Sequence, residues 1–230
     1  MNKISSRQNP WFKRIREAIR EHGPEIVIEG PKPVADAIAA GWNPVKVVTR
    51  DVDFTSEVFD ILAETKSPQN VIGLFERPIT SLAALFARQS SILVALDGVQ
   101  DPGNVGTIVR LAAAFDANGV ILLPGCADAF SPKAIRSSAG AILTVPVVSC
   151  STEQLLASGW PAIAADARGD LADPPARHAI LAFGSEGSGL SSSLANAAKT
   201  IAIDMSGRIE SLNVASSAAI LLARSYALRS

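Results

Sequence analysis

The sequence predicts an α/β protein of two domains, on three observations. Segments with the hydrophobic periodicity of strands and of helices alternate along most of its 230 residues. A polar gap at residues 88–91 separates two such series, immediately before the apolar run Ile92–Leu96. A hydrophobic content of 48% over this length suffices for two modest cores. We therefore predict domains at residues 1–88 and 89–230.

The net charge argues against a protein that is basic throughout. The formal charge at pH 7 is −1, so any surface that binds nucleic acid must be a local patch. One local excess lies in residues 1–22, with six basic and two acidic side chains. A helix from Pro10 to Glu21 would bring three basic residues to one face: Lys13, Arg16 and Arg20. A solvated surface helix and a contact with an RNA backbone both fit this pattern.

Cysteine and histidine form no metal-ligand or redox pattern. Cys126 and Cys150 are expected to be free thiols of an intracellular protein, with a single disulfide as the alternative. His22 and His178 are far apart, so we expect no histidine-based catalysis. The chain has no apolar run of 18 residues, and its first residues lack the apolar h-region that a signal peptide would have. We expect a cytoplasmic protein with no metal and no membrane partner.

The first domain alternates between strands and helices from Ile26 onward. Its hydrophobic pattern predicts strands at 26–29, 45–49 and 71–75, and helices at 34–40, 55–66 and near 81–87. A basic helix at residues 10–21 precedes them. Together they make a compact α/β unit of about the smallest size that folds alone.

The second domain continues the alternation. We predict strands at 92–96, 142–148, 161–165, 201–203 and before Gly184, and a loop at 168–177. Helices are expected after three capping residues: Asn104, Ser131 with Pro132 behind it, and Ser151 with Gln154 in a capping box. A last helix begins near Ser211, where Ser211 would be the cap and Asn213 would satisfy a loop carbonyl if neither has a role in chemistry.

Arg110 departs from the packing pattern of the helix after Asn104. The face toward the sheet is apolar: Val105, Ile108, Val109, Ala112 and Phe115. Arg110 falls off this face, on the side of Gly106, which leaves a trough for the guanidinium. Taken alone, Arg110 is an ordinary solvent-facing arginine.

The segment Gly184–Gly189 is a glycine-rich loop that follows an apolar strand. Its glycine order is not that of a dinucleotide-binding fold, and it lacks the Lys-Ser/Thr pair of a P-loop. Glycines allow a backbone to wrap closely around a flat polar ligand such as adenosine. Glu186 could orient a neighbouring group or lie in solvent.

The last helix is apolar on two faces. One face holds Leu212, Ala215, Ala219, Leu222 and Tyr226, and the other holds Val214, Ala218 and Leu221. Because one sheet covers only one face, we expect the second face to pack against something else.

Three segments in this order, LDGVQDPGNVGTIVRLAAAFDANGVILL, HAILAFGSEGSGLS and ESLNVASSAAILL, resemble the signature blocks of the SpoU/TrmH family. Its members are RNA ribose 2′-O-methyltransferases of the SPOUT superfamily. In the first domain, IVIEG and SPQNVIGLF resemble the substrate-binding domain of rRNA-directed members, which is similar to a small RNA-binding ribosomal protein. Three residues depart from the family pattern: Asn70 and Asp116 stand where glycine is usual, and Asp204 stands where proline is common. Asparagine tolerates the left-handed backbone that a glycine favours, so the turn at Asn70 is expected to survive.

The resemblance implies a methyltransferase domain with a deep trefoil knot over a mainly parallel sheet, and a homodimer. It implies S-adenosylmethionine as the cofactor, bound by Leu123, Gly184, Glu186, Gly187, Ile203, Met205, Leu212 and Asn213. The catalytic residues it implies are Arg110, Asn104, Glu186, Ser211 and Asn213. Arg110 matches the family's catalytic arginine. Because a guanidinium stays protonated, we expect Arg110 to stabilise charge rather than act as a base.

Three functions follow from these observations. The first is ribose 2′-O-methylation of large-subunit rRNA, favoured by the first domain. The second is the same reaction on tRNA, and the third is a non-catalytic RNA-binding or ribosome-assembly role. The third is disfavoured because all five implied catalytic residues are present. A Rossmann-type oxidoreductase is excluded by the missing fingerprint.

Overall fold

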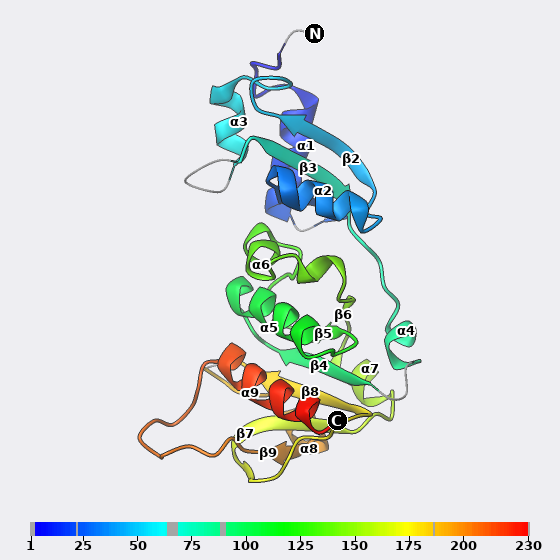
Figure 1. Ribbon diagram of the computed structural model, residues 1–230, viewed down its shortest axis with the longest axis vertical. Coiled ribbons are helices and arrows are strands. Elements are labelled where there is room, and N and C mark those ends of the chain that lie inside the picture. The colour runs from blue at the N-terminus through cyan, green and yellow to red at the C-terminus, as the bar shows by residue number, and fades with distance from the viewer. Residues whose placement is uncertain (1–2, 22, 64–68, 88–90, 186, 230) are drawn as a thin grey trace. The chain divides into compact units, whose positions relative to one another are not determined.

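The computed structural model describes residues 3–21, 23–63, 69–87, 91–185 and 187–229 (Figure 1). The chain forms two compact units. The first comprises Met1–Pro78 with Phe130–Arg136, and the second comprises Ile79–Ala129 with Ser137–Ser230. The short helix α4 (Leu82–Phe86) belongs to the second unit, because Leu85 and Phe86 pack into its core beside Trp160.

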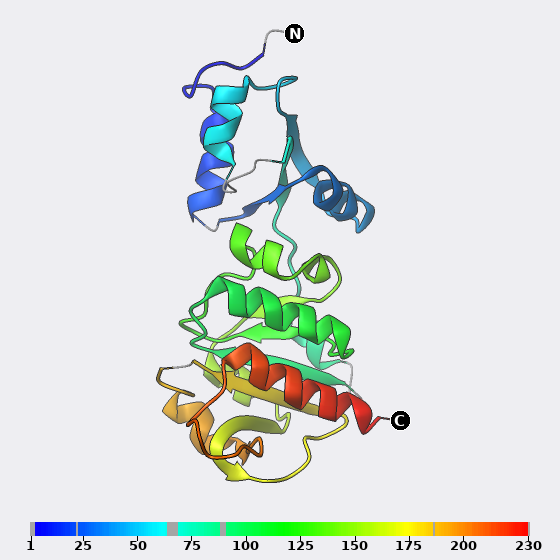
Figure 2. The same ribbon diagram turned by 60° about the vertical axis from the view of Figure 1, so that its left-hand side comes forward.

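The first unit is built on an antiparallel sheet in the order β1-β3-β2. Its elements are α1 (Pro10–Glu21), β1 (Glu25–Glu29), α2 (Pro31–Ala39), β2 (Pro44–Thr49), α3 (Ser56–Leu62) and β3 (Val71–Glu76), with most of α6 (Pro132–Ser137). Helices α1 and α3 cover one face of the sheet and α2 covers the other (Figure 2). The core under α1 and α3 includes Phe12, Phe54 and Phe59. The helix predicted at 10–21 and all three strands are confirmed.

Helix boundaries in the first unit differ from the predictions where proline or glycine intervenes. Helix α2 begins at Pro31 rather than 34, because Gly30 turns the chain with a φ of 113° and proline suits the first helical turn. Helix α3 ends at Leu62, and residues 64–66 of the prediction lie outside the described residues. Asn70 is not among the described residues with positive φ, so it does not adopt the left-handed backbone that its place in the family pattern suggested.

The second unit contains a six-stranded sheet whose paired strands all run parallel, in the order β6-β5-β4-β8-β7-β9. The strands are β4 (Ile92–Asp97), β5 (Val120–Leu122), β6 (Val147–Ser149), β7 (Ala162–Asp170), β8 (Ala179–Gly184) and β9 (Lys199–Ile201). Its longer helices are α5 (Pro102–Ala114) and α9 (Val214–Ala227), and its shorter ones include α7 (Thr152–Leu156) and α8 (Ser192–Ala197). Helices α5 and α9 lie side by side on one face (Figures 1 and 2). Alternating strands and helices thus give the expected α/β architecture.

The structure differs from the predicted secondary structure in two segments of the second unit. The strand expected at 142–148 is a 3-10 helix, Ala141–Leu143, followed by the short strand β6, because Pro146 has no backbone N–H for a strand ladder. Strand β7 continues to Asp170, through the start of the predicted loop. There Gly169 lies so close to β9 that a Cβ atom would be 2.7 Å from the Ile201 backbone.

The structure shows how an aspartate fits at position 116, where the family usually has glycine. It follows α5 with a φ of 52°, a conformation for which glycine is the usual residue. The carbonyl and carboxylate of Asp116 accept hydrogen bonds from Arg229 Nη1 at 2.9 and 3.1 Å. A non-glycine residue is strained at this φ, but the Asp116 side chain also binds Arg229 and so links the residues after α9 to the end of α5.

Candidate functional site

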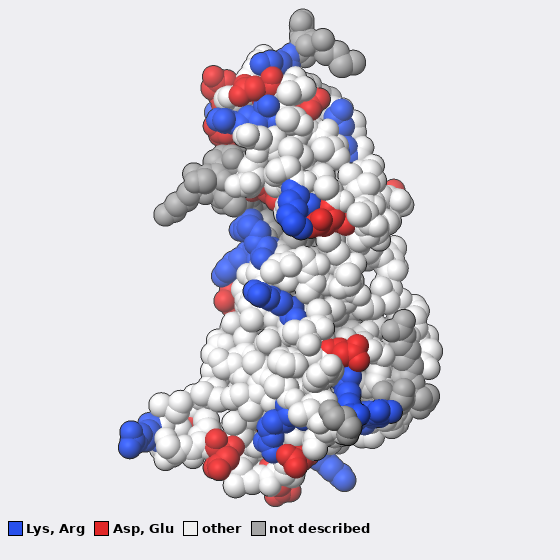
Figure 3. Space-filling model, in the orientation of Figure 1, with Lys and Arg blue, Asp and Glu red and all other residues white. Residues whose placement is uncertain are grey.

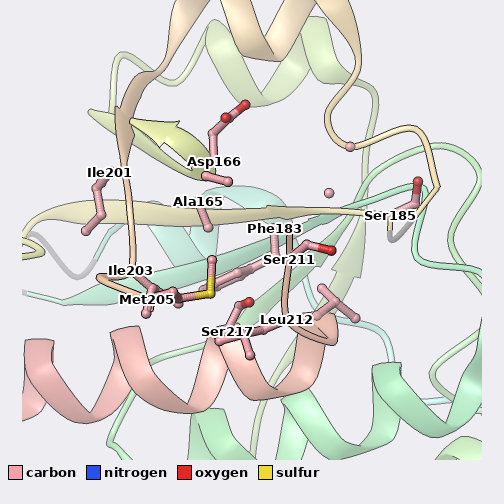
Figure 4. A pocket seen from close by; sticks show the side chains of 14 residues that line it. Ala165, Asp166, Phe183, Ser185, Ile201, Ile203, Met205, Ser211, Leu212 and Ser217 are labelled. Carbon is pink, nitrogen blue, oxygen red and sulfur yellow. The ribbon is translucent and has the colours of Figure 1, made fainter. Parts of the chain in front are cut away.

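A pocket lies at the carboxyl ends of β8 and β7, where ligands bind in parallel α/β sheets (Figure 4). It includes five residues predicted from the sequence: Gly184, Ile203, Met205, Ser211 and Leu212. The other lining residues are Ala165, Asp166, Ala167, Phe183, Ser185, Gly189, Ile201, Val214 and Ser217. The second and third sequence blocks therefore meet in one cavity.

Gly184 is fixed by the backbone that folds over it. A Cβ atom at this position would lie 2.3 Å from Gly189 C and 2.5 Å from Leu190 N, distances that no side chain tolerates. Ser185 and Gly189 exchange two backbone hydrogen bonds of 3.0 Å, which close the loop into a tight turn. The glycine therefore allows the loop to form, before any contact with a ligand.

Asp97 anchors the far end of the same loop, and sequence reasoning missed this role. Its carboxylate lies at the carboxyl end of β4, is only 6% exposed, and accepts a hydrogen bond from Ser191 N at 2.7 Å. A buried carboxylate is costly without such a partner, so the bond holds the glycine loop to the central strand. The position of Asp97 directly after a fully apolar strand was the available signal.

Asn104 and Asn213 are brought together, although neither lines the pocket. The Asn213 Nδ2 atom donates to Asn104 Oδ1 at 3.3 Å. The Asn213 Oδ1 atom accepts from Ala215 N at 2.9 Å and from Ser216 N at 3.4 Å, so Asn213 is the N-cap of α9. These bonds orient the amide so that its NH₂ group faces α5.

Two helix caps were therefore assigned wrongly from the sequence. Asp101, not Asn104, caps α5 by accepting from Gly103 N at 3.1 Å, and Pro102 occupies the first helical position, where proline is favoured. Asn213, not Ser211, caps α9. The caps predicted at Ser131 and at Ser151 with Gln154 are confirmed.

Arg110 is exposed on α5, while the apolar stripe Val105, Ile108, Val109 and Ala112 is fully buried. No hydrogen bond or ion pair holds its guanidinium among the described residues. It does not line the pocket. The predicted separation of Arg110 from the packing face is confirmed.

Two further predicted cofactor residues lie outside the pocket lining. Leu123 is buried and outside the pocket lining, with its backbone N–H bonded to Leu96 O at 2.9 Å. Gly187 is exposed and also outside the lining. Glu186 lies outside the described residues.

Neither cysteine lines the pocket, and burial disfavours the reactive thiolate form of both. Burial raises the pKa of the Cys126 thiol, whose Sγ lies 3.1 Å from the Leu96 carbonyl oxygen, and burial also raises the pKa of Cys150. Both are free thiols, as predicted. The hydrogen bond from Arg168 lowers the pKa of Asp166, whose carboxylate points away from Met205 and Ser211 (Figure 4).

Metal and membrane features are absent from the part of the chain that the structure describes. Those residues include no group of three His, Cys, Asp or Glu side chains placed to hold a metal ion. None of their helices is both long and apolar enough to cross a membrane.

Exchange of the Asn213 amide for a carboxylate tests the asparagine pair. Asn213→Asp retains the cap acceptor but turns the donor toward Asn104 into a second acceptor. We expect the thermal stability to change little and the methyl transfer to RNA that the family resemblance implies to fall roughly tenfold, the scale of one lost hydrogen bond. Asn213→Ala should lower both the thermal stability and the methyl transfer, because it removes the cap acceptor as well as the donor toward Asn104. Equal transfer by Asn213→Asp and the unchanged protein would show that the Asn104 contact has no functional role.

Comparison with known proteins agrees with this arrangement. Residues 91–223 match the model of the SpoU rRNA methylase family. A 23S rRNA guanosine 2′-O-methyltransferase of Bacillus subtilis is 28% identical, over 96% of this chain and 98% of that protein. The crystal structure of an AdoMet-bound rRNA methyltransferase from Sinorhizobium meliloti, also 28% identical, superposes with a TM-score of 0.87 over 99% of this chain and 98% of that one.

A structure described as giving insight into 2′-OH methylation of C/U34 on tRNA matches a smaller part. It is 26% identical, with a TM-score of 0.53, and covers 59% of this chain but 95% of its own. The family match spans more than half of the chain and contains all three sequence blocks. The chain belongs to the SpoU rRNA methylase family.

Proposed function

We propose that this protein transfers a methyl group from S-adenosylmethionine to a ribose 2′-oxygen of large-subunit rRNA. The observation that carries the proposal is the pocket in which the second and third family blocks meet, at the carboxyl edge of a parallel sheet. The rRNA-directed relatives match nearly the whole chain, whereas the tRNA-related structure corresponds to about the length of one domain. This difference favours rRNA over tRNA.

The pocket suits S-adenosylmethionine by shape and by wall chemistry. Gly184, Ser185 and Gly189 line the cavity with little or no side chain, so a flat ligand such as adenine can approach the backbone closely. Apolar side chains of Phe183, Ile203 and Leu212 supply surfaces for a flat ring. When bound, this cofactor supplies an activated methyl group.

We infer that the passage from β9 at the sheet edge to α9 beside α5 forms the trefoil knot of the family.

The chain's own residues would align the substrate and stabilise charge. Arg110 presents a permanently protonated guanidinium that can pair with an RNA phosphate and with the negative charge that develops on the 2′-oxygen. The Asn104–Asn213 pair joins the start of α5 to the start of α9, and Ser211 lies two residues before the α9 cap. Glu186, carried over from the family pattern, completes the proposed set.

Mapping of methyl groups tests the proposal directly. Deproteinised rRNA and tRNA are incubated with the protein and labelled S-adenosylmethionine, and 2′-O-methylated positions are identified by resistance to alkaline cleavage. We expect one labelled nucleotide in large-subunit rRNA. Label confined to tRNA would support the second function. Cofactor binding without transfer to either RNA would contradict the proposed reaction.

The first unit is proposed to select the RNA, and the second to bind the cofactor by itself. A fragment comprising residues 79–230 retains the pocket and the core around α4. We expect it to bind S-adenosylmethionine within about threefold of the full chain but to lose most activity on rRNA. Circular dichroism checks that the fragment is folded. A folded fragment that methylates rRNA as fast as the full chain would show that the first unit does not select substrate.

The second apolar face of α9 is covered within one chain, so the proposed homodimer needs another surface. Val214, Ala218 and Leu221, the face of α9 that was expected to need a partner, are at most 5% exposed within one chain. They are covered because α9 packs on both α5 and β8. Apolar side chains still exposed on α9 include Ile220 and Tyr226. These residues, with the family resemblance, support a dimer through the outer side of α9.

Light scattering at micromolar concentration tests the dimer. We expect twice the chain mass for the unchanged protein and a shift toward the single-chain mass for Ile220→Glu, because a charge would be buried without a partner. Lys32→Glu, on the first unit, is the matched surface control. A monomer at all concentrations would contradict the proposal.

A further inference from the structure

Helix α1 of the first unit borders a groove whose exposed side chains are mainly basic. Arg7, Lys13, Arg16 and Arg20 line it, together with Phe12 at its floor. Phe12 is 2% exposed because its ring belongs to the core between α1 and the sheet. Packing of Phe12 in the core therefore holds α1, and with it Lys13, Arg16 and Arg20, against the sheet.

These four cations have no side-chain partner among the residues that the structure describes. Arg7, Lys13, Arg16 and Arg20 are exposed, and none forms an ion pair or hydrogen bond through its side chain with any residue in the described ranges. Lys13, Arg16 and Arg20 are spaced three and four residues apart, so they lie along one side of the helix.

Arg14 shows the contrast on the same helix. Its Nε donates to Glu25 Oε2 at 3.0 Å, and its guanidinium lies 5.4 Å from the Trp11 ring centre. Helix α1 thus uses one arginine for internal structure and leaves the groove cations available.

Charge in the first unit is segregated toward this groove. Residues 1–21 carry six basic and two acidic side chains, whereas residues 23–88 carry six and nine. Two basic residues elsewhere in the unit are paired with carboxylates: Lys32 with Asp36, and Arg50 with Asp60. On the face drawn in Figure 3, basic and acidic residues are scattered rather than gathered into one broad patch.

We propose that the α1 groove binds the sugar–phosphate backbone of the RNA substrate, a surface whose role rests on the proposed function. From residue 13 to residue 20 the helix rises roughly 10 Å, about one Debye length at physiological salt, so the fields of the three helix cations add. Guanidinium groups bind phosphate oxygens in two-pronged contacts. Such contacts position RNA without reading its sequence.

The acidic residues of the groove restrict how the strand lies. Glu17 and Glu21 line the groove one position after Arg16 and Arg20, so they occupy an adjacent side of the helix. Their carboxylates repel phosphate, so the RNA backbone follows the side of Lys13, Arg16 and Arg20. The groove therefore favours one path over a broad, non-specific contact.

An anionic membrane is the less suitable partner. A helix that binds a membrane surface inserts an apolar face between lipids. In α1 the apolar face is already packed in the core, with Phe12 and Ile15 buried. The groove side of the helix therefore offers charged and polar groups for contact.

Salt-dependent binding tests the groove in the full-length protein. The variant K13Q/R16Q/R20Q is compared with unchanged protein by filter binding to deproteinised large-subunit rRNA, without cofactor, across a KCl series. We expect at least tenfold weaker binding at roughly 0.1 M KCl. The slope of log K against log salt should become shallower by about 2, since each lost phosphate contact removes roughly 0.7–0.9.

The matched control is K32Q/R50Q, which removes two cations of the same unit that already pair with carboxylates. Its slope and its affinity for rRNA should stay near those of unchanged protein. Cofactor affinity of the triple variant should be unchanged, and its single-turnover methyl transfer should recover at saturating rRNA, because the groove binds but does not catalyse.

Three results would overturn the groove proposal. The first is a triple variant with unchanged affinity and slope, and the second is an equal loss in K32Q/R50Q. The third is retained rRNA binding with lost binding to vesicles of phosphatidylglycerol and phosphatidylcholine. Failure of the proposed function looks different: unchanged protein would bind rRNA with the expected slope yet transfer no methyl group to it.

Discussion

Gly184→Ala is expected to weaken S-adenosylmethionine binding by roughly 100-fold while the chain remains folded. The added Cβ would meet backbone atoms of Gly189 and Leu190 at 2.3–2.5 Å, and backbone cannot rotate away as a side chain can. The turn closed by Ser185 and Gly189 must then open, and one wall of the pocket moves. A buried polar group left without its partner costs about 1–3 kcal/mol, which is the scale of this loss of affinity. Calorimetric titration with the cofactor measures the effect.

Gly187→Ala is the matched comparison within the same loop. Among the described residues beyond its chain neighbours, no atom lies within 4 Å of a Cβ placed there, and Gly187 is outside the pocket lining. We expect its cofactor affinity to fall less than about threefold. Unchanged affinity in Gly184→Ala would show that this loop is not part of the cofactor site. Equal losses in both variants would show that the loop tolerates no added methyl group, and that the Gly184 contact is not special.

Local patterns predicted most of the elements, because those elements are decided by local chemistry. Helix α1 has the predicted bounds because its apolar face and Pro10 agree. Strand β4 is buried throughout and apolar from Ile92 to Leu96, as expected for a strand covered on both sides by helices. Where two local signals competed, prediction failed: Asp101 and Asn104 are both good caps, and Pro102 decided in favour of Asp101.

The pocket was only partly predictable for a physical reason. Gly184 and Leu212 belong to recognisable blocks, but Ala165 and Ala167 come from β7, outside all three blocks, and carry no chemical signal. Their positions follow from the strand order, which places β7 between β8 and β9. The contact between Asn104 and Asn213 likewise needs two helices far apart in the sequence to begin side by side. Periodicity within a segment does not contain that information.

Arg110→Ala should leave folding and cofactor binding nearly unchanged while methyl transfer falls at least roughly 100-fold. Arg110 is exposed, without a partner among the described residues and outside the pocket lining, so the loss of stability should stay within about 0.5 kcal/mol. The expected loss of rate is the scale seen when a positioned charge is removed from a transition state. Single-turnover transfer from labelled S-adenosylmethionine to rRNA measures it, alongside calorimetric cofactor binding.

Arg110→Lys separates charge from geometry. An ammonium retains the positive charge but cannot reproduce a two-pronged contact with phosphate, so we expect most of the activity to remain lost. Arg177→Ala is the control, since Arg177 is also exposed and lies outside the pocket. Near-normal transfer by Arg110→Ala would make Arg110 an ordinary surface arginine. If Arg110→Ala instead loses cofactor binding in the absence of RNA, Arg110 would be a residue of the cofactor site.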